Sequence, residues 1–587
     1  YVLFGKPGMF KGKLQMTHPE IEPLANFNKP LKGGLEGVYS TTEKLKARKL
    51  DSRAIRKLME VLIPQVINHV SETLPAYVRK RQGLLPRAKA LKEIHFPPNT
   101  DMLSQAQQTL KFEELFYVQM RLLNIKAKRN KEIKGQVFKA VGDQFNTFYN
   151  QHLPFELTGA QKRVIKEIRK DMGTGSQLNR LLQGDVGSGK TVVALLCALI
   201  AIDNGFQAAI MAPTEILAQQ HYETIFDLLS EMHINVALLT GSSKTAYRKK
   251  LHTNLENSQI HILIGTHALL EDKVKFNNLG FVVIDEQHRF GVAQRSRLWR
   301  KNTIPPHVLV MTATPIPRTL AMTVYGDLDV SIIDELPPGR KPIKTVHRKD
   351  SHRLQVFGFM RDEIKKGRQV YVVYPLIEES EALDYKDLMD GYESIARAFP
   401  NPDYQVSIVH GKMKPEDKEF EMKRFAEGQC QIMVATTVIE VGVNVPNASV
   451  MVVESSERFG LSQLHQLRGR VGRGADQSYC ILMTGNKLSN EGRKRISTMC
   501  ETNDGFRIAE VDLKLRGPGD LMGTQQSGIM EFNIADIIKD TLILDKASDE
   551  AQYIFENDPR LEHEQLVLVK DHLSRIMKRK PNWGRIS

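Results

Sequence analysis

The sequence has few cysteines and no long apolar run. Its four cysteines are scattered singly, at Cys197, Cys430, Cys480 and Cys500, without a C-x-x-C pair. This spacing fits neither a zinc cluster nor a disulfide framework, and unpaired cysteines are typical of a reducing cytoplasm. The longest apolar run, residues 192–202, has 11 residues, whereas a helix needs about 20 to cross a bilayer. We therefore expect no membrane-spanning segment and no membrane partner.

The chain also shows no internal repeat, no low-complexity tract and no signal peptide. It begins Tyr-Val-Leu-Phe without a methionine or a charged segment, which indicates an amino-terminally truncated chain. With 41% hydrophobic and 26% charged residues the composition is that of a globular protein, and 587 residues at about 150 per domain predict several domains. The 82 Lys and Arg exceed the 68 Asp and Glu, and the net charge of +14 favours a phosphate-rich partner.

Short strands and helices are predicted in the outer parts of the chain. Residues 1–40 hold short apolar runs between Gly and Pro, which indicates the last strands of a small β domain. Residues 41–140 predict a helical linker, whose basic stretch at 126–134 is typical of a solvated helix face. Residues 485–587 are expected to form helices and loops, interrupted by Gly and Pro at 517–519.

Two middle segments, 141–349 and 350–484, each alternate short apolar strands with helices. Strands that are apolar on both faces are typical of a parallel sheet covered by helices on both sides. The predicted fold class is therefore α/β and multidomain, with two parallel-sheet domains in tandem. The strand candidates are 180–183, 208–211, 261–264, 281–284 and 308–311 in the first segment, and 369–373, 405–409, 431–434, 449–453 and 478–482 in the second.

A phosphate-binding loop is predicted between the strand ending at Gln183 and the apolar helix beginning near Val192. The pattern G-x-x-x-x-G-K-[ST] is matched by Gly184, Asp185, Val186, Gly187, Ser188, Gly189, Lys190 and Thr191. The glycines let backbone N–H groups face phosphate oxygens at the helix N-terminus. Lys190 is expected to reach the β- and γ-phosphates of ATP, and Thr191 to hold Mg²⁺. A glycine-rich turn that binds nothing is the alternative, and a second motif argues against it.

The second motif is a pair of carboxylates, Asp285 and Glu286, directly after the apolar strand at 281–284. Such a strand end faces the nucleotide crevice of an α/β sheet. Asp285 is expected to position Mg²⁺ and Glu286 to orient or deprotonate the attacking water, since phosphoryl transfer needs mainly placement and charge stabilisation. Alone, the pair is typical of a solvated strand end. Together with the phosphate-binding loop it predicts ATP hydrolysis.

Three arginines, Arg468, Arg470 and Arg473, lie close together in the second α/β segment. This density of guanidinium groups is too basic for a core helix. Arg470 and Arg473 are therefore candidates for arginine fingers that reach the γ-phosphate from the second domain. The alternative is a structural arginine cluster, or one that contacts a phosphate backbone.

The order of these motifs resembles that of superfamily 2 helicases over residues 155–484. The shared series comprises 157–161, the phosphate-binding loop, 212–215, 240–241, 265–267, 285–288, 312–315, 410–411, 435–443 and 466–473. Within that superfamily, the segments that resemble the RecG family of branch-migration helicases are 312–320, 326–329, 457–463 and 512–528. The last is similar to a translocation motif shared only with the transcription-repair coupling translocase.

The resemblance implies roles for further residues. Those that would flank and read the adenine are Phe155 and Gln161. Those that match nucleic-acid backbone contacts, which grip phosphates without reading bases, are Thr214, Thr240, Thr266, His410 and Thr436. Those that would link the γ-phosphate site to strand movement are His288, Thr312 and Thr314. Those that would join a helical hairpin to a loop moving along duplex DNA are Arg495, Arg516 and Gln526.

The resemblance also implies an ATP-dependent duplex-DNA translocase that remodels stalled forks and Holliday junctions. In RecG-like proteins an OB-type wedge domain splits the arms, and residues 1–40 resemble only its closing part. The family further implies a monomer of the bacterial cytoplasm and nucleoid, with single-strand-binding protein as a partner. Two other functions stay open: a duplex translocase that displaces bound protein complexes, and a nucleotide-regulated DNA-binding scaffold without turnover.

Overall fold

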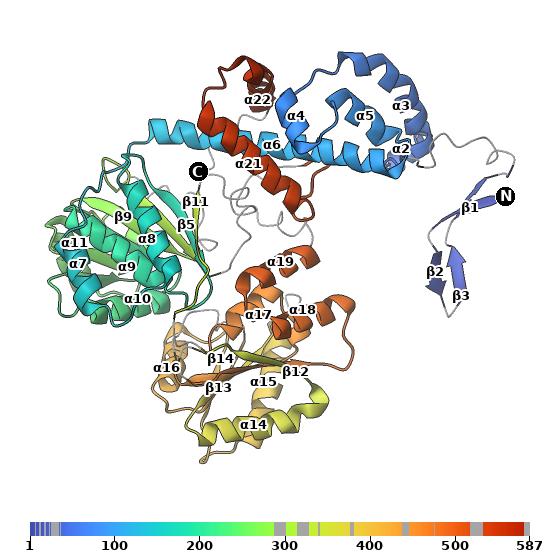
Figure 1. Ribbon diagram of the computed structural model, residues 1–587. Helices are drawn as coiled ribbons and strands as arrows, with labels where there is room; N and C mark the ends of the chain where they lie inside the picture. Colours follow the sequence, from blue (N-terminus) through green and yellow to red (C-terminus); the bar gives the residue numbers. More distant parts are fainter. Residues whose placement is uncertain are drawn as a thin grey trace. The chain divides into compact units, whose positions relative to one another are not determined.

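The folded chain comprises two compact units (Figure 1). The first consists of Tyr1–Leu123 with Met530–Pro581, and the second of Asn124–Ile529 with Asn582–Ser587. The segment expected at 485–587 is therefore divided between the units. The computed structural model describes residues 1–5, 7–10, 13–16, 19–22, 24, 35, 37–286, 301–313, 328–337, 341–375, 381–436, 445–472, 474, 476–516 and 532–579.

The first unit contains short antiparallel strands and a helical bundle. Its strand pairs are β1 (Val2–Phe4) with β4 (Glu20–Glu22), and β2 (Pro7–Phe10) with β3 (Lys13–Met16). The helices in its described part are α2 (Glu43–Ala47), α3 (Ser52–Val66), α4 (Ala76–Gln82), α5 (Arg87–His95), the first part of α6 (Thr100–Glu132), α21 (Thr541–Asn557) and α22 (Val567–Arg579).

Residues distant in sequence share the core of this bundle. Phe112 and Phe116 of α6 are buried in one cluster with Leu544 of α21. Beside them, Lys111 Nζ donates to Asp540 Oδ1 at 2.8 Å. Since α21 and α22 cover aromatic side chains of α6, the helices before residue 123 and those after residue 532 bury one common core.

The first sheet of the second unit has seven parallel strands. In spatial order they are β11 (Asp329–Ile333), β5 (Asn179–Gly184), β10 (His307–Thr312), β9 (Leu279–Asp285), β6 (Gln207–Met211), β8 (Ile262–Gly265) and β7 (Val236–Leu239). The five strands predicted in this segment are confirmed, and β7 and β11 are added to them.

Both faces of the first sheet are buried under helices. Leu182 and Ile210 pack in one cluster, whereas their neighbours Leu181 and Ala209 pack in another on the opposite face. Residues 192–201 of α9 are apolar on every side of the helix, and all ten are buried. Among the described residues, the helices of this domain are α7 (Asp143–Thr147), α8 (Gly159–Met172), α9 (Lys190–Asp203), α10 (Glu215–Leu228) and α11 (Thr245–Glu256). Within the described ranges, no helix is long and apolar enough to cross a membrane.

The second sheet has six parallel strands. In spatial order they are β12 (Lys344–Lys349), β17 (Tyr479–Thr484), β16 (Ala448–Val453), β13 (Gln369–Tyr374), β15 (Ile432–Thr436) and β14 (Val406–Val409). The predicted pair of tandem parallel-sheet domains is thus confirmed. The boundary expected at 349/350 needs correction, because β12 is hydrogen-bonded to β17 of this second sheet.

Helices also cover both faces of the second sheet. One cluster holds side chains of α16 (Pro415–Ala426), α17 (Leu461–Arg468), α18 (Asn490–Glu501) and α19 (Gly505–Arg516). The other holds side chains of α14 (Arg353–Lys365) and α15 (Glu381–Ala398). Helices α18 and α19 follow the last strand of this sheet in sequence. Their side chains pack in the same buried cluster as those of α17.

A buried histidine ties the segment after α6 to the first sheet. His307, at the start of β10, has no exposed surface. Leu178 N donates to its Nδ1 at 2.9 Å, so the ring proton is on Nε2, which lies 2.8 Å from Gln136 O and donates to it. Burial lowers the pKa of His307 to about 4, although the bond to Gln136 acts in the opposite direction. The uncharged ring therefore bridges two backbone segments.

Mild acid is expected to destabilise this bridge. An unfolded imidazole takes up its proton near pH 6.5 and the folded one only near pH 4. The contribution of His307 is therefore complete above pH 6.5 and falls as the pH drops, by about 2 kcal/mol between pH 7 and pH 5. His307→Gln removes the titrating group but keeps one acceptor and one donor. Thermal unfolding at both pH values should show a smaller acid loss in this variant, and equal losses would exclude His307 as the titrating group.

Candidate functional site

The predicted nucleotide residues gather at one edge of the first sheet. Because all its strands are parallel, their carboxyl ends share this edge. The phosphate-binding loop follows β5, and Asp285 ends β9. The intervening strand, β10, pairs Thr312 with Gln183 and Met311 with Asp285. The loop and the carboxylates are therefore separated by two strand spacings, about 10 Å.

The phosphate-binding loop has a left-handed backbone at two positions. Gly187 and Gly189 have φ angles of 77° and 84°, a region that glycine enters without a steric cost. Gly189 directly precedes α9, so the loop ends at a helix N-terminus. Lys190 Nζ donates to the carbonyls of Gly184 and Asp185 at 2.8 and 2.9 Å. The ammonium group is thus held at the loop.

The two residues predicted to meet the adenine lie before and within α8. Gln161 is buried and caps the helix together with Thr158. Its Nε2 donates to Ser188 O at 2.9 Å, so this side chain supports the loop backbone directly. Phe155 is 43% exposed, and an exposed aromatic ring is suited to stacking on an adenine. Adenine contact stays a prediction for both residues.

The adjacent carboxylates Asp285 and Glu286 differ in their electrostatics. Burial raises the pKa of Asp285, but the hydrogen bond and charge of His221, 2.9 Å from its Oδ2, hold it below its usual value. Burial and the charge of Asp285 raise the pKa of Glu286 to about 7, against the opposing charges of Lys190 and Arg470. An ionised carboxylate beside one that titrates near neutrality is suited to a cation ligand beside a general base.

The predicted nucleic-acid and coupling residues lie at strand ends. They are Thr214, Thr240 and Thr266 after β6, β7 and β8, Thr312 at the end of β10, His410 after β14 and Thr436 at the end of β15. Thr214 also caps α10, because its Oγ1 accepts from Leu217 N at 3.4 Å. Burial and the charges of Lys418 and Lys412 lower the pKa of His410. Parallel pairing thus places the first four on the edge that carries the phosphate-binding loop.

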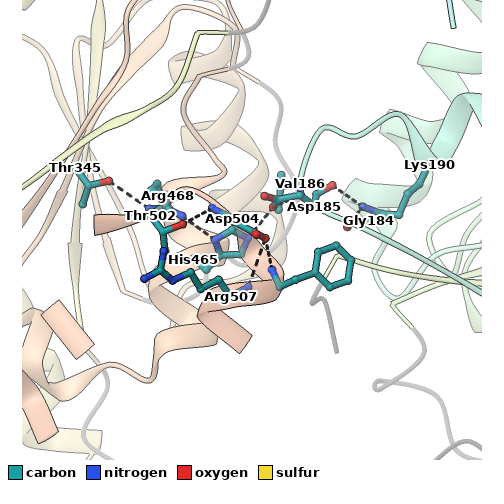
Figure 2. A network of polar contacts seen from close by, with 11 residues as sticks. Gly184, Asp185, Val186, Lys190, Thr345, His465, Arg468, Thr502, Asp504 and Arg507 are labelled. Carbon is teal, nitrogen blue, oxygen red and sulfur yellow. Dashed lines mark hydrogen bonds and ion pairs between the residues drawn. The ribbon is translucent and has the colours of Figure 1, made fainter. Parts of the chain in front are cut away.

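Helix α17, which packs on the second sheet, contacts the phosphate-binding loop of the first domain (Figure 2). His465 Nε2 lies 2.7 Å from Asp185 Oδ1. A Cβ on Gly469 would lie 2.7 Å from Cβ of Val186, so only glycine permits this close approach. The charge of Arg470, one residue further, acts on Glu286. The two α/β domains are therefore in contact at the predicted nucleotide site.

Of the three clustered arginines, Arg468 is the structural one. It is 2% exposed. Its guanidinium donates to His465 Nδ1 at 3.1 Å and to the carbonyls of Met499 and Thr502 at 3.0 and 2.8 Å. The structural alternative therefore holds for Arg468, whereas Arg470 lies where its charge reaches the first domain.

The residues predicted to take part in translocation begin with Arg495. Arg495, on α18, donates to Glu457 O at 3.5 Å, and its Nη2 pairs with Glu491 at the same distance. The predicted residues that lie outside the described residues are His288, Thr314, Arg473 and Gln526. Arg516 ends α19, and its side chain is likewise outside the description.

Three polar contacts of the site went unpredicted. His221 lies two helical turns after the cap at Thr214, with no sequence signal for its partner Asp285. Asp512 of α19 caps α17, a contact across 50 residues. His465 did carry a signal, since it lies three residues before Arg468 on one helix face and next to the arginine motif.

Two parallel-sheet domains, with a phosphate-binding loop and carboxylate pair on one and an arginine motif on the other, define a helicase motor. Three families match in order along the chain: DEAD/DEAH box helicase at 158–323, helicase conserved C-terminal domain at 353–475, and ATP-dependent DNA helicase RecG, domain 3, C-terminal, at 502–587. The chain belongs to the RecG family of ATP-dependent DNA helicases.

Individual relatives support this assignment. An ATP-dependent DNA helicase RecG of Synechocystis is 47% identical over 94% of this chain and 65% of its own length. One of Aquifex aeolicus is 43% identical over 96% of this chain and 72% of its own length. A solved structure of RecG bound to a three-way DNA junction matches with a TM-score of 0.66 and 39% identity, over 92% of this chain and 70% of that one. The chain thus spans about two thirds of the first of these relatives.

The close approach of Gly469 to Val186 gives a prediction. Gly469→Ala is expected to force α17 off the phosphate-binding loop and to weaken ATP binding by about tenfold, the scale of an overpacked contact. Gly358→Ala is the matched control, because no atom lies within 4 Å of its Cβ position. Titration with a fluorescent ATP analogue measures both. Unchanged affinity in Gly469→Ala would show that the contact is dispensable for nucleotide binding.

Proposed function

We propose that the chain is an ATP-driven translocase on duplex DNA that remodels branched DNA, reversing stalled forks and moving Holliday junctions. One observation carries the proposal: α17 of the second α/β domain contacts the phosphate-binding loop of the first, where His465 Nε2 lies 2.7 Å from Asp185 Oδ1, and this contact brings the charge of Arg470 to Glu286. A site assembled from two domains is suited to a cycle in which ATP binding closes the cleft and hydrolysis reopens it. Membership of the RecG family supports DNA as the substrate of this motor.

The following roles are proposed for the residues of the site. Lys190 leaves the loop carbonyls for the β- and γ-phosphates of the substrate ATP. Glu286 accepts the proton of the attacking water, for which a pKa near the working pH is favourable. Arg470 and Arg473 stabilise the charge that develops on the γ-phosphate. Phe155 and Gln161 hold the adenine.

The oxygen donors of Asp285 and Thr191 fit Mg²⁺. Asp285 offers a carboxylate whose pKa is held low, and Thr191 offers a hydroxyl in the first turn of α9. Both are hard oxygen donors of the kind that Mg²⁺ prefers beside substrate phosphates. The ion would neutralise charge on the β- and γ-phosphates. His221 keeps Asp285 oriented through its hydrogen bond to Oδ2.

The DNA path is proposed to follow the same sheet edges. Threonine hydroxyls and His410 at the strand ends grip the phosphate backbone without reading bases, so translocation is independent of sequence. Arg495, Arg516 and Gln526 connect the α18–α19 hairpin to the loop that moves along the duplex. With a formal net charge of +14, binding is expected to weaken steeply with salt. A monomer suffices for this scheme, and single-strand-binding protein is its proposed partner.

The raised pKa of Glu286 gives a pH prediction. A base with a pKa of about 7 is protonated and inactive below that pH, so kcat/KM for ATP is expected to rise with pH through about 7. Glu286→Asp changes the group that titrates, and the rising limb should move with it. Steady-state ATPase profiles from pH 5.5 to 9 measure both, over roughly the range that brackets such a limb. A limb that stays in place in the variant would assign it to another group.

The DNA specificity of hydrolysis tests the proposed function itself. ATP turnover is measured without DNA, with single strands, with linear duplex and with a four-way junction. Duplex and junction are expected to stimulate turnover strongly, and Glu286→Gln to lower it by about 10²- to 10⁴-fold. Stimulation by linear duplex alone would favour displacement of bound proteins over branch remodelling. Turnover that ignores DNA, or none at all, would leave the regulated scaffold as the better account.

A further inference from the structure

We infer that His465 is a positioning residue that couples the phosphate-binding loop to the helical hairpin α18–α19. The inference rests on the proposed function and names a residue through which DNA and ATP affect each other's binding. The contacts form a continuous series from Lys190 to the first turn of α19 (Figure 2). His465 is the member of the series that spans the two α/β domains.

The orientation of the His465 ring is determined by Arg468. A guanidinium group has only donors, so Nδ1 of His465 must accept from Arg468 Nη2 at 3.1 Å. The ring proton is then on Nε2, from which it is donated to Asp185 Oδ1 at 2.7 Å. The imidazole is 4% exposed, so water competes little for either bond. His465 therefore joins a buried cation to a loop carboxylate with a fixed polarity.

The far side of Arg468 is attached to the hairpin. Arg468 Nη1 donates to the carbonyls of Met499 and Thr502, where α18 ends. Thr502 Oγ1 in turn accepts from Asp504 N at 3.1 Å, and Asp504 Oδ1 accepts from Phe506 N at 2.8 Å in the first turn of α19. The turn between the two hairpin helices is thus built around the carbonyls that Arg468 holds.

The other end of α17 is attached to the same hairpin. Asp512 of α19 accepts from Leu461 N at 3.3 Å and from Ser462 Oγ at 2.7 Å, in the first turn of α17. Asp512 is buried, so this cap is shielded from water. Because α17 is held at both ends, it moves together with α18 and α19. A displacement of the hairpin therefore displaces His465.

On the loop side, Asp185 shapes the backbone that surrounds the phosphates. Its Oδ1 also accepts from Val186 N at 2.6 Å, and its carbonyl accepts from Lys190 Nζ at 2.9 Å. When Lys190 turns to the phosphates of ATP, Asp185 loses one of its contacts and the loop adjusts. His465 transmits that adjustment to the hairpin. By thermodynamic linkage, DNA bound at the hairpin changes the binding free energy of ATP by the same amount as ATP changes that of DNA.

The test is the equilibrium coupling between nucleotide and DNA. The affinity for a non-hydrolysable ATP analogue is measured with and without saturating linear duplex, and the ratio is the coupling factor. His465→Leu, which can neither accept nor donate, is expected to lower this factor by about tenfold, within the usual range of coupling between sites. His465→Gln keeps one acceptor and one donor and is expected to retain most of it. His352→Leu replaces an exposed histidine of the same domain and serves as the matched control.

A second variant changes the contact from the side of the loop, so that a folding defect caused by His465→Leu in the second domain cannot account for both results. Asp185→Ala leaves the bonds of Arg468 intact and is expected to lower the coupling factor as His465→Leu does. The double variant should lower the coupling factor no further, because both changes break the same contact, that between His465 Nε2 and Asp185 Oδ1. A wild-type factor in either single variant, or additive losses in the double variant, would overturn the inference. A wild-type protein without coupling would instead contradict the proposed function.

Discussion

The parallel pairing of every strand in the two sheets is the constraint on which the rest of the structure depends. Parallel strands need crossover connections, and these place helices on both faces, so the central strands are buried and the polar groups of the site are left at the strand ends. That is why the phosphate-binding loop, Asp285 and Thr312 share one edge although more than 120 residues separate the first from the last. The same rule in the second sheet places His410 and Thr436 at one edge.

The two neighbouring carboxylates Asp285 and Glu286 are both buried, but their pKa values are shifted in opposite directions. Asp285 is held ionised by His221, whereas Glu286, next in sequence, has its pKa raised by burial and by the charge of Asp285. Two positive charges, one from each α/β domain, oppose that rise. The pKa of Glu286 therefore depends on how near Arg470 of the second α/β domain lies to this carboxylate.

Local patterns in the sequence predicted what depends on local physics. Apolar runs identified the central strands, and glycine and lysine at fixed spacing identified the phosphate-binding loop, because backbone conformation and charge are encoded within a few residues there. The sequence does not identify β12 as a strand of the second domain, because its mostly polar and half-exposed residues give no apolar run. His221, Asp512 and the packing of Leu544 on α6 depend on tertiary contacts between distant segments, for which one sequence carries no signal.

ATP hydrolysis at this sheet edge is proposed to move the protein along duplex DNA. The most direct measurement is the release of a labelled triplex-forming strand bound to a duplex that carries a three-way junction at one end. ATP-dependent release is expected from the wild-type chain, with no release when a non-hydrolysable analogue replaces ATP and none by Lys190→Ala. A wild-type chain that hydrolyses ATP on this DNA but leaves the third strand in place would contradict this proposal.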